Sequence, residues 1–261
     1  MKRRHRQQLV RGVLYVVFVL AVGGLVALAD WETVRSSFFD LDTARGMFPE
    51  VVTLAARNTI VYTFLAFVFG LFFGLVLALM KLSPVGPYRW VATIYIEIFR
   101  GLPALLTIFL FAFGVPIAFQ WQPPGGIAGA GVLGLIVVAA AYIAETIRAG
   151  IEAVPKGQVE AARSLGMSAT WAMISVVLPQ AFRIVIPPLT NELVLLIKDT
   201  SLLALVGVTA GTRELTNFAR VELFATNNST PLVVAGLLYV AITIPLTQLI
   251  AVLERRNARA R

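Results

Sequence analysis

Long uncharged apolar stretches alternate with short polar segments along the 261-residue chain. A helix needs about 20 mostly apolar residues to cross a bilayer, and several stretches reach that length. The pattern therefore predicts an all-α integral membrane protein with six transmembrane helices. We expect these helices near residues 12–29, 58–80, 91–114, 128–148, 183–206 and 229–253. The third and fourth are separated at residues 116–126, where three prolines and two adjacent glycines interrupt the apolar run.

The fifth predicted helix differs from the others because it carries charges. Glu192, Lys198 and Asp199 would each cost about 2.5 to 3.5 kcal/mol at the centre of a membrane. The apolar residues between them do not offset that cost. We therefore expect the fifth helix to be enclosed by other helices.

Basic residues are distributed unevenly between the two sides of the predicted bundle. If the N-terminus is cytoplasmic, 14 of them lie inside, at positions 2, 3, 4, 6, 11, 81, 89, 148, 156, 163, 255, 256, 259 and 261. Only 5 lie outside, at positions 35, 45, 57, 213 and 220, together with an acidic cluster in residues 30–50. Because Lys and Arg favour cytoplasmic loops, we predict that both termini are cytoplasmic.

The first predicted span has a second interpretation. A basic start, an apolar stretch and Ala27-Leu28-Ala29 before Asp30 resemble a cleavable secretory signal. The apolar stretch of about 17 residues exceeds the usual length of about 7 to 15 in such signals. We therefore expect this span to be retained.

Composition excludes several classes of function. The chain is 58% hydrophobic and 14% charged, whereas a soluble domain has about 25% charged residues. Its net charge of +8 comes from residues between apolar runs, which does not favour nucleic-acid binding. With no Cys and one His, His5, the chain offers little for zinc binding or His-based catalysis.

The longest predicted cytoplasmic loop, residues 149–182, has the pattern of two short helices. Residues 158–165 favour a helix that Gly166 would end in a left-handed conformation. Ser168 can cap a second helix, which should end or kink by Pro179. DNA-binding proteins also use a helix, a turn and a second helix. Here, however, residues 171–177 offer no Arg, Lys, Asn or Gln to contact bases, which disfavours that alternative.

The same loop resembles the EAA loop of ABC importer permeases. The residues that match are Glu160, Ala161, Ala162, Gly166, Leu178 and Pro179. The resemblance implies that the first helix of the loop, which carries Glu160, Ala161 and Ala162, docks on a cytoplasmic ATPase subunit and couples ATP hydrolysis to transport. Among the matching residues, we expect Ala161 and Ala162 to allow close backbone approach.

Three further segments, 99–103, 141–145 and 198–202, are similar to the permeases for polar amino acids such as His, Gln, Glu, Arg and opines. The resemblance covers about residues 55–254 and implies a five-helix permease core at residues 58–254. Residues 1–57, with a basic tail, the first span and an external loop, have no counterpart in that core. A basic cytoplasmic tail follows at residues 255–261.

Charged and polar residues within the spans are candidates for a hydrated pathway for a zwitterionic solute. They are Glu97, Arg100, Glu145, Asn191, Glu192, Lys198 and Asp199. Glu97 and Arg100 share one helix face, so a structural ion pair is an alternative for them. Pro187 and Pro188 either kink the fifth helix or free carbonyls toward a cavity. The glycines at positions 70 and 74 favour close helix packing.

The chain has no phosphate-binding G-x-x-x-x-G-K-[ST] sequence, so we expect ATP to be used by a partner and no cofactor to be bound here. It is then a transport subunit and not an enzyme. The resemblance implies a bacterial cytoplasmic membrane location. It also implies three kinds of partner: ABC ATPase subunits, a second identical or different permease subunit, and an extracytoplasmic solute-binding protein. The subunit would also contact the lipid bilayer. We expect no nucleic-acid partner.

Two other classes remain open. An ion-gradient-driven amino-acid carrier is the main alternative, although such carriers commonly show internal repeats and none is visible here. An intramembrane enzyme would have to rely on a carboxylate pair, because Cys is absent and His nearly so.

Overall fold

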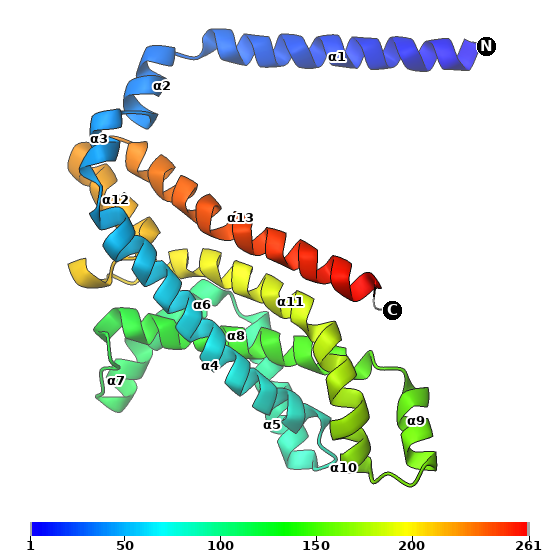
Figure 1. The fold of residues 1–261 in the computed structure, drawn as a ribbon. Helices are drawn as coiled ribbons and strands as arrows, with labels where there is room; N and C mark the ends of the chain where they lie inside the picture. The colour runs from blue at the N-terminus through cyan, green and yellow to red at the C-terminus, as the bar shows by residue number, and fades with distance from the viewer. Residues whose placement is uncertain (1, 260–261) are drawn as a thin grey trace.

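The structure is a computed structural model that describes residues 2–259, and the elements in this part of the chain are helical (Figure 1). The α-helices are α1 (Lys2–Leu28), α2 (Trp31–Phe38), α3 (Leu41–Gly46), α4 (Arg57–Leu82), α5 (Gly86–Gly101), α6 (Ala104–Phe109), α7 (Val115–Phe119), α8 (Gly126–Glu152), α9 (Lys156–Ser164), α10 (Ala169–Ala172), α11 (Leu178–Asp199), α12 (Leu215–Thr226) and α13 (Thr230–Arg259). Three π-helical stretches, Val51–Ala56, Leu110–Gly114 and Met173–Val177, and two 3₁₀ turns, Thr200–Leu205 and Ala210–Thr212, complete the set.

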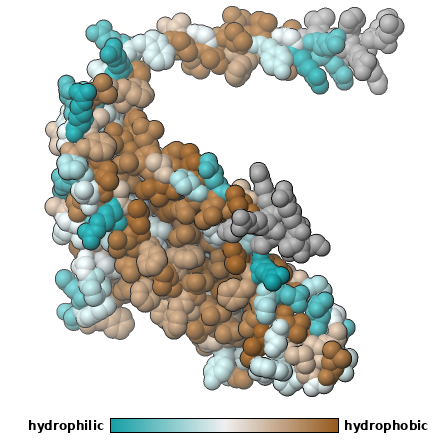
Figure 2. Space-filling model, viewed as in Figure 1, coloured by the Kyte–Doolittle hydropathy of each residue, from teal (hydrophilic) through white to brown (hydrophobic). Residues whose placement is uncertain are grey.

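Five of these helical segments are long and apolar enough to cross a membrane: Val10–Leu28, Val51–Leu82, Gly126–Glu152, Ala169–Leu205 and Thr230–Val252. Figure 2 shows a mainly hydrophobic body between polar surfaces at α2 and α3 and at the end that carries α9. This distribution is that of a multi-pass membrane protein, whose apolar surface faces lipid.

The helix predicted for residues 91–114 is not one straight span. α5 and the segment Ala104–Phe119 meet at an angle of 109°. Pro103 causes the break, because a residue before proline avoids the helical conformation and Leu102 is extended, with φ −85° and ψ 143°. The prediction of a continuous third helix was therefore wrong.

The packing of α4 against α8 forms the centre of the bundle. A Cβ atom added at Gly70 would lie 2.8 Å from the Cβ of Ala139, and one at Gly74 would lie 3.1 Å from the carbonyl oxygen of Ala140. The two backbones approach this closely only because Gly lacks a side chain. The predicted role of both glycines in helix packing is confirmed.

The fifth predicted span begins earlier than expected. Helical structure runs from residue 169 to residue 205, so the second helix of the loop is continuous with the fifth predicted span. Pro179 does not end it, because the π-helical stretch Met173–Val177 widens the helix just before the proline. The second helix predicted for the loop and the fifth predicted span are therefore one continuous helical segment.

α11 is also less covered than predicted. Only 22% of the most apolar window in the helical segment Ala169–Leu205 is buried, and Asn191 and Lys198 of α11 are exposed. The other helices of this chain therefore do not enclose the polar face of α11.

Residues 30–57, predicted as an external loop, are largely helical and pack against the body. Met47, Val51 and Ala55 are buried with Leu215 and Phe218 of α12 in a second apolar cluster. Backbone hydrogen bonds reinforce the contact: the N–H of Ser229 donates to the carbonyl of Ser37 over 2.8 Å. By contrast, α1 extends away from the body (Figure 1), and none of its apolar window is buried.

Candidate functional site: the loop after α8 and the polar face of α11

The loop after α8 forms a short helix, a tight turn and a second helix. α9 ends in a Schellman motif: Gly166 has φ +85°, its N–H donates to Arg163 over 3.0 Å, and the N–H of Met167 donates to Ala162 over 3.2 Å. Ser168 then accepts a hydrogen bond from the N–H of Trp171 over 3.2 Å and caps α10. The predicted glycine turn and serine cap are both confirmed.

The residues of the EAA pattern do not all face the same way. Glu160, Ala161 and Gly166 are exposed, whereas Ala162 is buried within the chain. Leu178 and Pro179 lie in the first turn of α11, half-buried and exposed respectively. Ala162 therefore packs against its own chain, and its carbonyl accepts a hydrogen bond in the turn. Of the two alanines, only Ala161 has an exposed surface that another protein can approach closely.

Two large apolar side chains at this loop are exposed and were not singled out from the sequence. Leu165 is 84% exposed at the turn and Trp171 is 59% exposed on α10. Exposed apolar surface of this kind commonly marks a protein contact. The signal was present in the sequence, because large apolar residues flank a glycine turn in a loop otherwise rich in small and polar residues.

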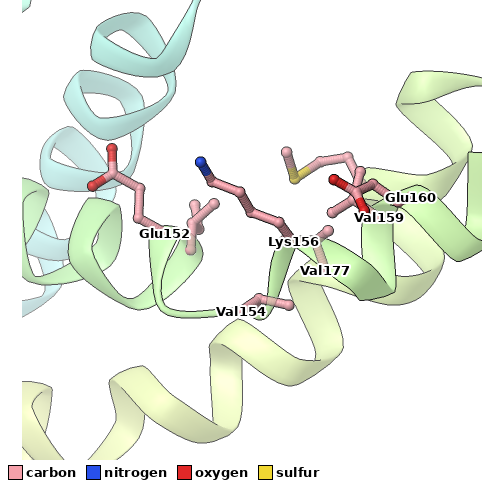
Figure 3. A pocket seen from close by; sticks show the side chains of 8 residues that line it. Glu152, Val154, Lys156, Val159, Glu160 and Val177 are labelled. Carbon is pink, nitrogen blue, oxygen red and sulfur yellow. The ribbon is translucent and has the colours of Figure 1, made fainter.

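A pocket of about 700 Å³ lies between the end of α8 and the two helices of the loop. Its walls are apolar, with Val154, Val159 and Val177, and its rim carries Glu152, Lys156 and Glu160 (Figure 3). Lys156 extends from the start of α9 toward the α8 side of this pocket (Figure 3). Among the described residues, no ion pair joins Lys156 to either carboxylate.

Several of the predicted pathway residues come together on α5 and α11. Glu192 lies within electrostatic range of both Arg100 and Asp199. The guanidinium carbon of Arg100 lies 5.6 Å from the centre of the Tyr142 ring, a cation–π contact. Glu97 and Arg100 are both exposed, and the alternative of a structural ion pair between them is wrong in this structure.

Asn191, Leu195 and Lys198 lie at positions i, i+4 and i+7 of α11, and all three are exposed. This spacing places them on one face of the helix. Pro187 and Pro188 lie within α11, one turn before Asn191. The exposed face of α11 therefore carries the charged group of Lys198 and the amide of Asn191. The neighbouring helices of this chain do not cover that face.

Glu145 has different partners. Its carboxylate accepts a hydrogen bond from Lys81 over 3.1 Å and from the Nε of Arg148 over 3.0 Å. Lys81 is in the last turn of α4, so the contact joins α4 to α8. No hydrogen bond or ion pair in the described part of the chain joins Glu145 to Asn191, Glu192, Lys198 or Asp199 of α11.

A buried carboxylate lies near the opposite end of the molecule, and sequence reasoning did not find it. Glu214 is fully buried at the start of α12, where it accepts hydrogen bonds from the N–H groups of Thr216 and Asn217 over 2.7 and 2.6 Å. The hydroxyl of Tyr239 donates to it over 3.0 Å. Burial raises the pKa of Glu214 to about 7.

Comparison with known proteins identifies the family. Residues 70–259 match the family described as binding-protein-dependent transport system inner membrane component. The probable glutamine ABC transporter permease protein GlnM of Bacillus subtilis is 38% identical over 211 residues, which is 76% of this chain and 89% of the relative. The arginine transport system permease protein ArtQ of the same species is 35% identical over 189 residues, covering 72% and 84% of the two chains.

A solved structure agrees with these relatives. The crystal structure of an amino acid ABC transporter with histidines matches with a TM-score of 0.76 and 35% identity, over 83% of this chain and 98% of that chain. These matches support an importer permease and not the ion-gradient carrier that the sequence had left open. The chain belongs to the binding-protein-dependent transport system inner membrane component family and is the membrane-spanning permease subunit of an ABC importer.

Proposed function

We propose that this permease carries a polar amino acid into the cell, driven by ATP that a separate subunit hydrolyses. The observation that carries the proposal is the exposed α9 with its Schellman turn, held at one polar end of the bundle. Relatives named for glutamine and arginine support an amino-acid substrate. The chain itself would bind no cofactor and would not act as an enzyme.

We place the permease in the bacterial cytoplasmic membrane with six crossings, counting the bent pair of α5 and residues 104–119 as one. Five long apolar segments and this pair support that count. Both termini and the loop with α9 would then be cytoplasmic, in agreement with the excess of Lys and Arg on that side.

The ATPase subunit would dock on the loop at Glu160, Ala161, Leu165 and Trp171. A cleft on the ATPase can approach the backbone closely at Ala161, and Leu165 and Trp171 supply exposed apolar area. Gly166 holds α9 at a fixed angle to α10, so movement of the ATPase would reach α11 through the continuous helix that begins at residue 169.

A second permease subunit would cover the open face of α11. Lys198 is exposed there, and facing hydrocarbon would cost about 2.5 to 3.5 kcal/mol. A partner subunit of the same kind, identical or different, presents a matching polar face, and the two together would enclose a passage. Arg100, Asn191, Glu192, Lys198 and Asp199 would line it, with both signs of charge for the carboxylate and ammonium groups of an amino acid.

An extracytoplasmic binding protein would deliver the solute at the end that carries α2, α3 and α12. The family description supports such a partner, because it names transport that depends on a binding protein. The choice of amino acid would rest largely with that protein.

The proposal is tested by reconstitution. The tagged chain is extracted with its partners from the native membrane, placed in liposomes, and supplied with binding protein and labelled glutamine or arginine. We expect uptake only when ATP is available to the ATPase, and co-purification of the ATPase in stoichiometric amount. Uptake by the chain alone on an ion gradient, without ATP, would refute the proposal.

A further inference from the structure

A chain of ion pairs joins the end of α4 to the end of α8. Lys81 contacts Glu145, Glu145 contacts Arg148, and Arg148 contacts Glu152. The side chains of Lys81, Glu145 and Arg148 are 17%, 20% and 24% exposed, so these three are partly protected from solvent. Glu152, the last residue of α8, is 53% exposed.

Arg148 is the centre of this chain. Its Nε and one amino group contact Glu145, and its other amino group contacts Glu152. Arg, with several donors in a rigid planar group, is well suited to hold two carboxylates in this way. The arrangement ties the final turn of α8 to the preceding turn, and through Lys81 to α4.

The last turn of α8 is also where the cytoplasmic loop is attached. Three residues, 153–155, separate Glu152 from the start of α9. At the same level, a Cβ atom added at Gly150 would lie 2.0 Å from a methyl group of Val185, so α8 and α11 are in close contact there. Both ends of the loop therefore enter the bundle at this point.

The pocket of about 700 Å³ between α8 and the loop is space into which α9 can move. Glu152 lies on its rim opposite Lys156 and Glu160 (Figure 3). Without a firm attachment, displacement of α9 would shrink this pocket and leave α4 and α8 unmoved. A firm attachment at Glu152 would pass the displacement to α8, and to α4 through their glycine contact.

We propose that the ion-pair chain Lys81–Glu145–Arg148–Glu152 is the device that holds the attachment of the coupling helix rigid, with Arg148 as its central positioning residue. This inference rests on the proposed import function. It also gives Glu145 a role in coupling in place of one in the solute pathway. The ion-pair chain acts between the ATPase and the membrane helices and does not touch the solute.

The test measures ATP hydrolysed per solute imported, in liposomes that hold permease, ATPase and binding protein. Arg148→Gln removes the residue at the centre of the ion-pair chain. Glu152→Gln removes only the ion pair between Arg148 and Glu152. We expect ATP hydrolysis to continue while uptake falls, so that the ratio rises about tenfold in Arg148→Gln and less in Glu152→Gln. Arg148→Lys keeps the charge and should recover part of the coupling.

A matched control is available in the exposed pair Asp42–Arg45, whose side chains are 94% and 78% exposed. Arg45→Gln should leave the ratio unchanged. An unchanged ratio in Arg148→Gln, or an equal fall of ATP hydrolysis and uptake, would overturn the inference. So would loss of the ATPase from the Arg148→Gln complex together with a wild-type ratio in Glu152→Gln, because Arg148 would then serve only the fold. If wild-type liposomes show no ATP-driven uptake, the proposed function fails instead.

Discussion

The N–H of Met167 donates to the carbonyl of Ala162 over 3.2 Å, across a turn that Gly166 makes possible with φ +85°. A side chain at this position is strained in the left-handed region by about 1 to 2 kcal/mol. Nothing lies within 4 Å of a Cβ atom added there, so backbone strain is the only penalty. We expect Gly166→Ala to misplace α9 and to lower ATP-driven uptake, measured in liposomes.

Gly157, in the first turn of α9, is the matched control for this change. It too has nothing within 4 Å of an added Cβ atom, but its φ is not positive. Gly157→Ala should therefore leave uptake near the wild-type value. Equal effects of the two substitutions would contradict the importance of the left-handed turn.

A second prediction concerns the contact between α4 and α8. In Gly74→Ala the new Cβ atom would lie 2.9 Å from a methyl group of Ile143 and 3.1 Å from the backbone of Ala140. Overpacking of this kind typically costs about 1 to 3 kcal/mol. We expect a lower melting temperature in detergent. Gly236→Ala, on α13 with nothing within 4 Å, provides the comparison and should not lower it.

A third prediction follows from the buried carboxylate at the start of α12. The pKa of Glu214 is raised from 4.5 to about 7, so the folded protein holds a proton that the unfolded chain has released in that range. The free energy of unfolding should therefore fall as the pH rises from about 4.5 to about 7, by up to about 3 kcal/mol in total. Thermal melting of the purified protein at pH 5.5 and pH 8 measures the part of this loss that falls above pH 5.5.

Glu214→Gln should flatten the pH dependence, because the amide does not titrate. The hydrogen bonds of this side chain to Thr216, Asn217 and Tyr239 will be only partly kept. The relevant result is therefore the slope of stability against pH and not the absolute stability. Glu222→Gln makes the same change of charge on α12 and should keep the wild-type slope. A slope unchanged by Glu214→Gln would assign the pH dependence to other groups.

A fourth prediction concerns the exposed face of α11. A hydrogen bond to a charged group is worth about 1.5 to 3 kcal/mol, so Lys198→Met should lower solute uptake about tenfold or more if this face lines the passage. Assembly with the ATPase, assayed by co-purification, should persist. Arg220→Met removes an exposed charge on α12 instead and should have little effect. Normal uptake by Lys198→Met would remove that residue from the passage.

Local signals predicted the structure of the loop after α8 well. A glycine in a left-handed turn and a serine cap depend on neighbours within a few residues, and both appear at Gly166 and Ser168. The predicted helix at residues 158–165 is close to the observed Lys156–Ser164. The long apolar stretches also predicted where most membrane helices lie, because the bilayer imposes their length.

Features that depend on tertiary structure were harder to predict from the sequence. The bend at Leu102 was missed because the apolar pattern continues on both sides of it, although Pro103 was a visible signal. Burial of Glu214 depends on Tyr239, 25 residues later, and on the packing of α12 against α13. The spacing of Glu97 and Arg100 allowed an ion pair, but Arg100 contacts Tyr142 of α8 instead.

The isolation of α1 has a consequence for how the protein is made. Its apolar window needs no packing surface from later parts of the chain, since none of that window is buried. α1 can therefore enter the bilayer as soon as the ribosome has released it. With the N-terminus cytoplasmic, as we propose, the basic residues at positions 2, 3, 4, 6 and 11 would fix its direction early and favour the side of the membrane on which each later helix begins.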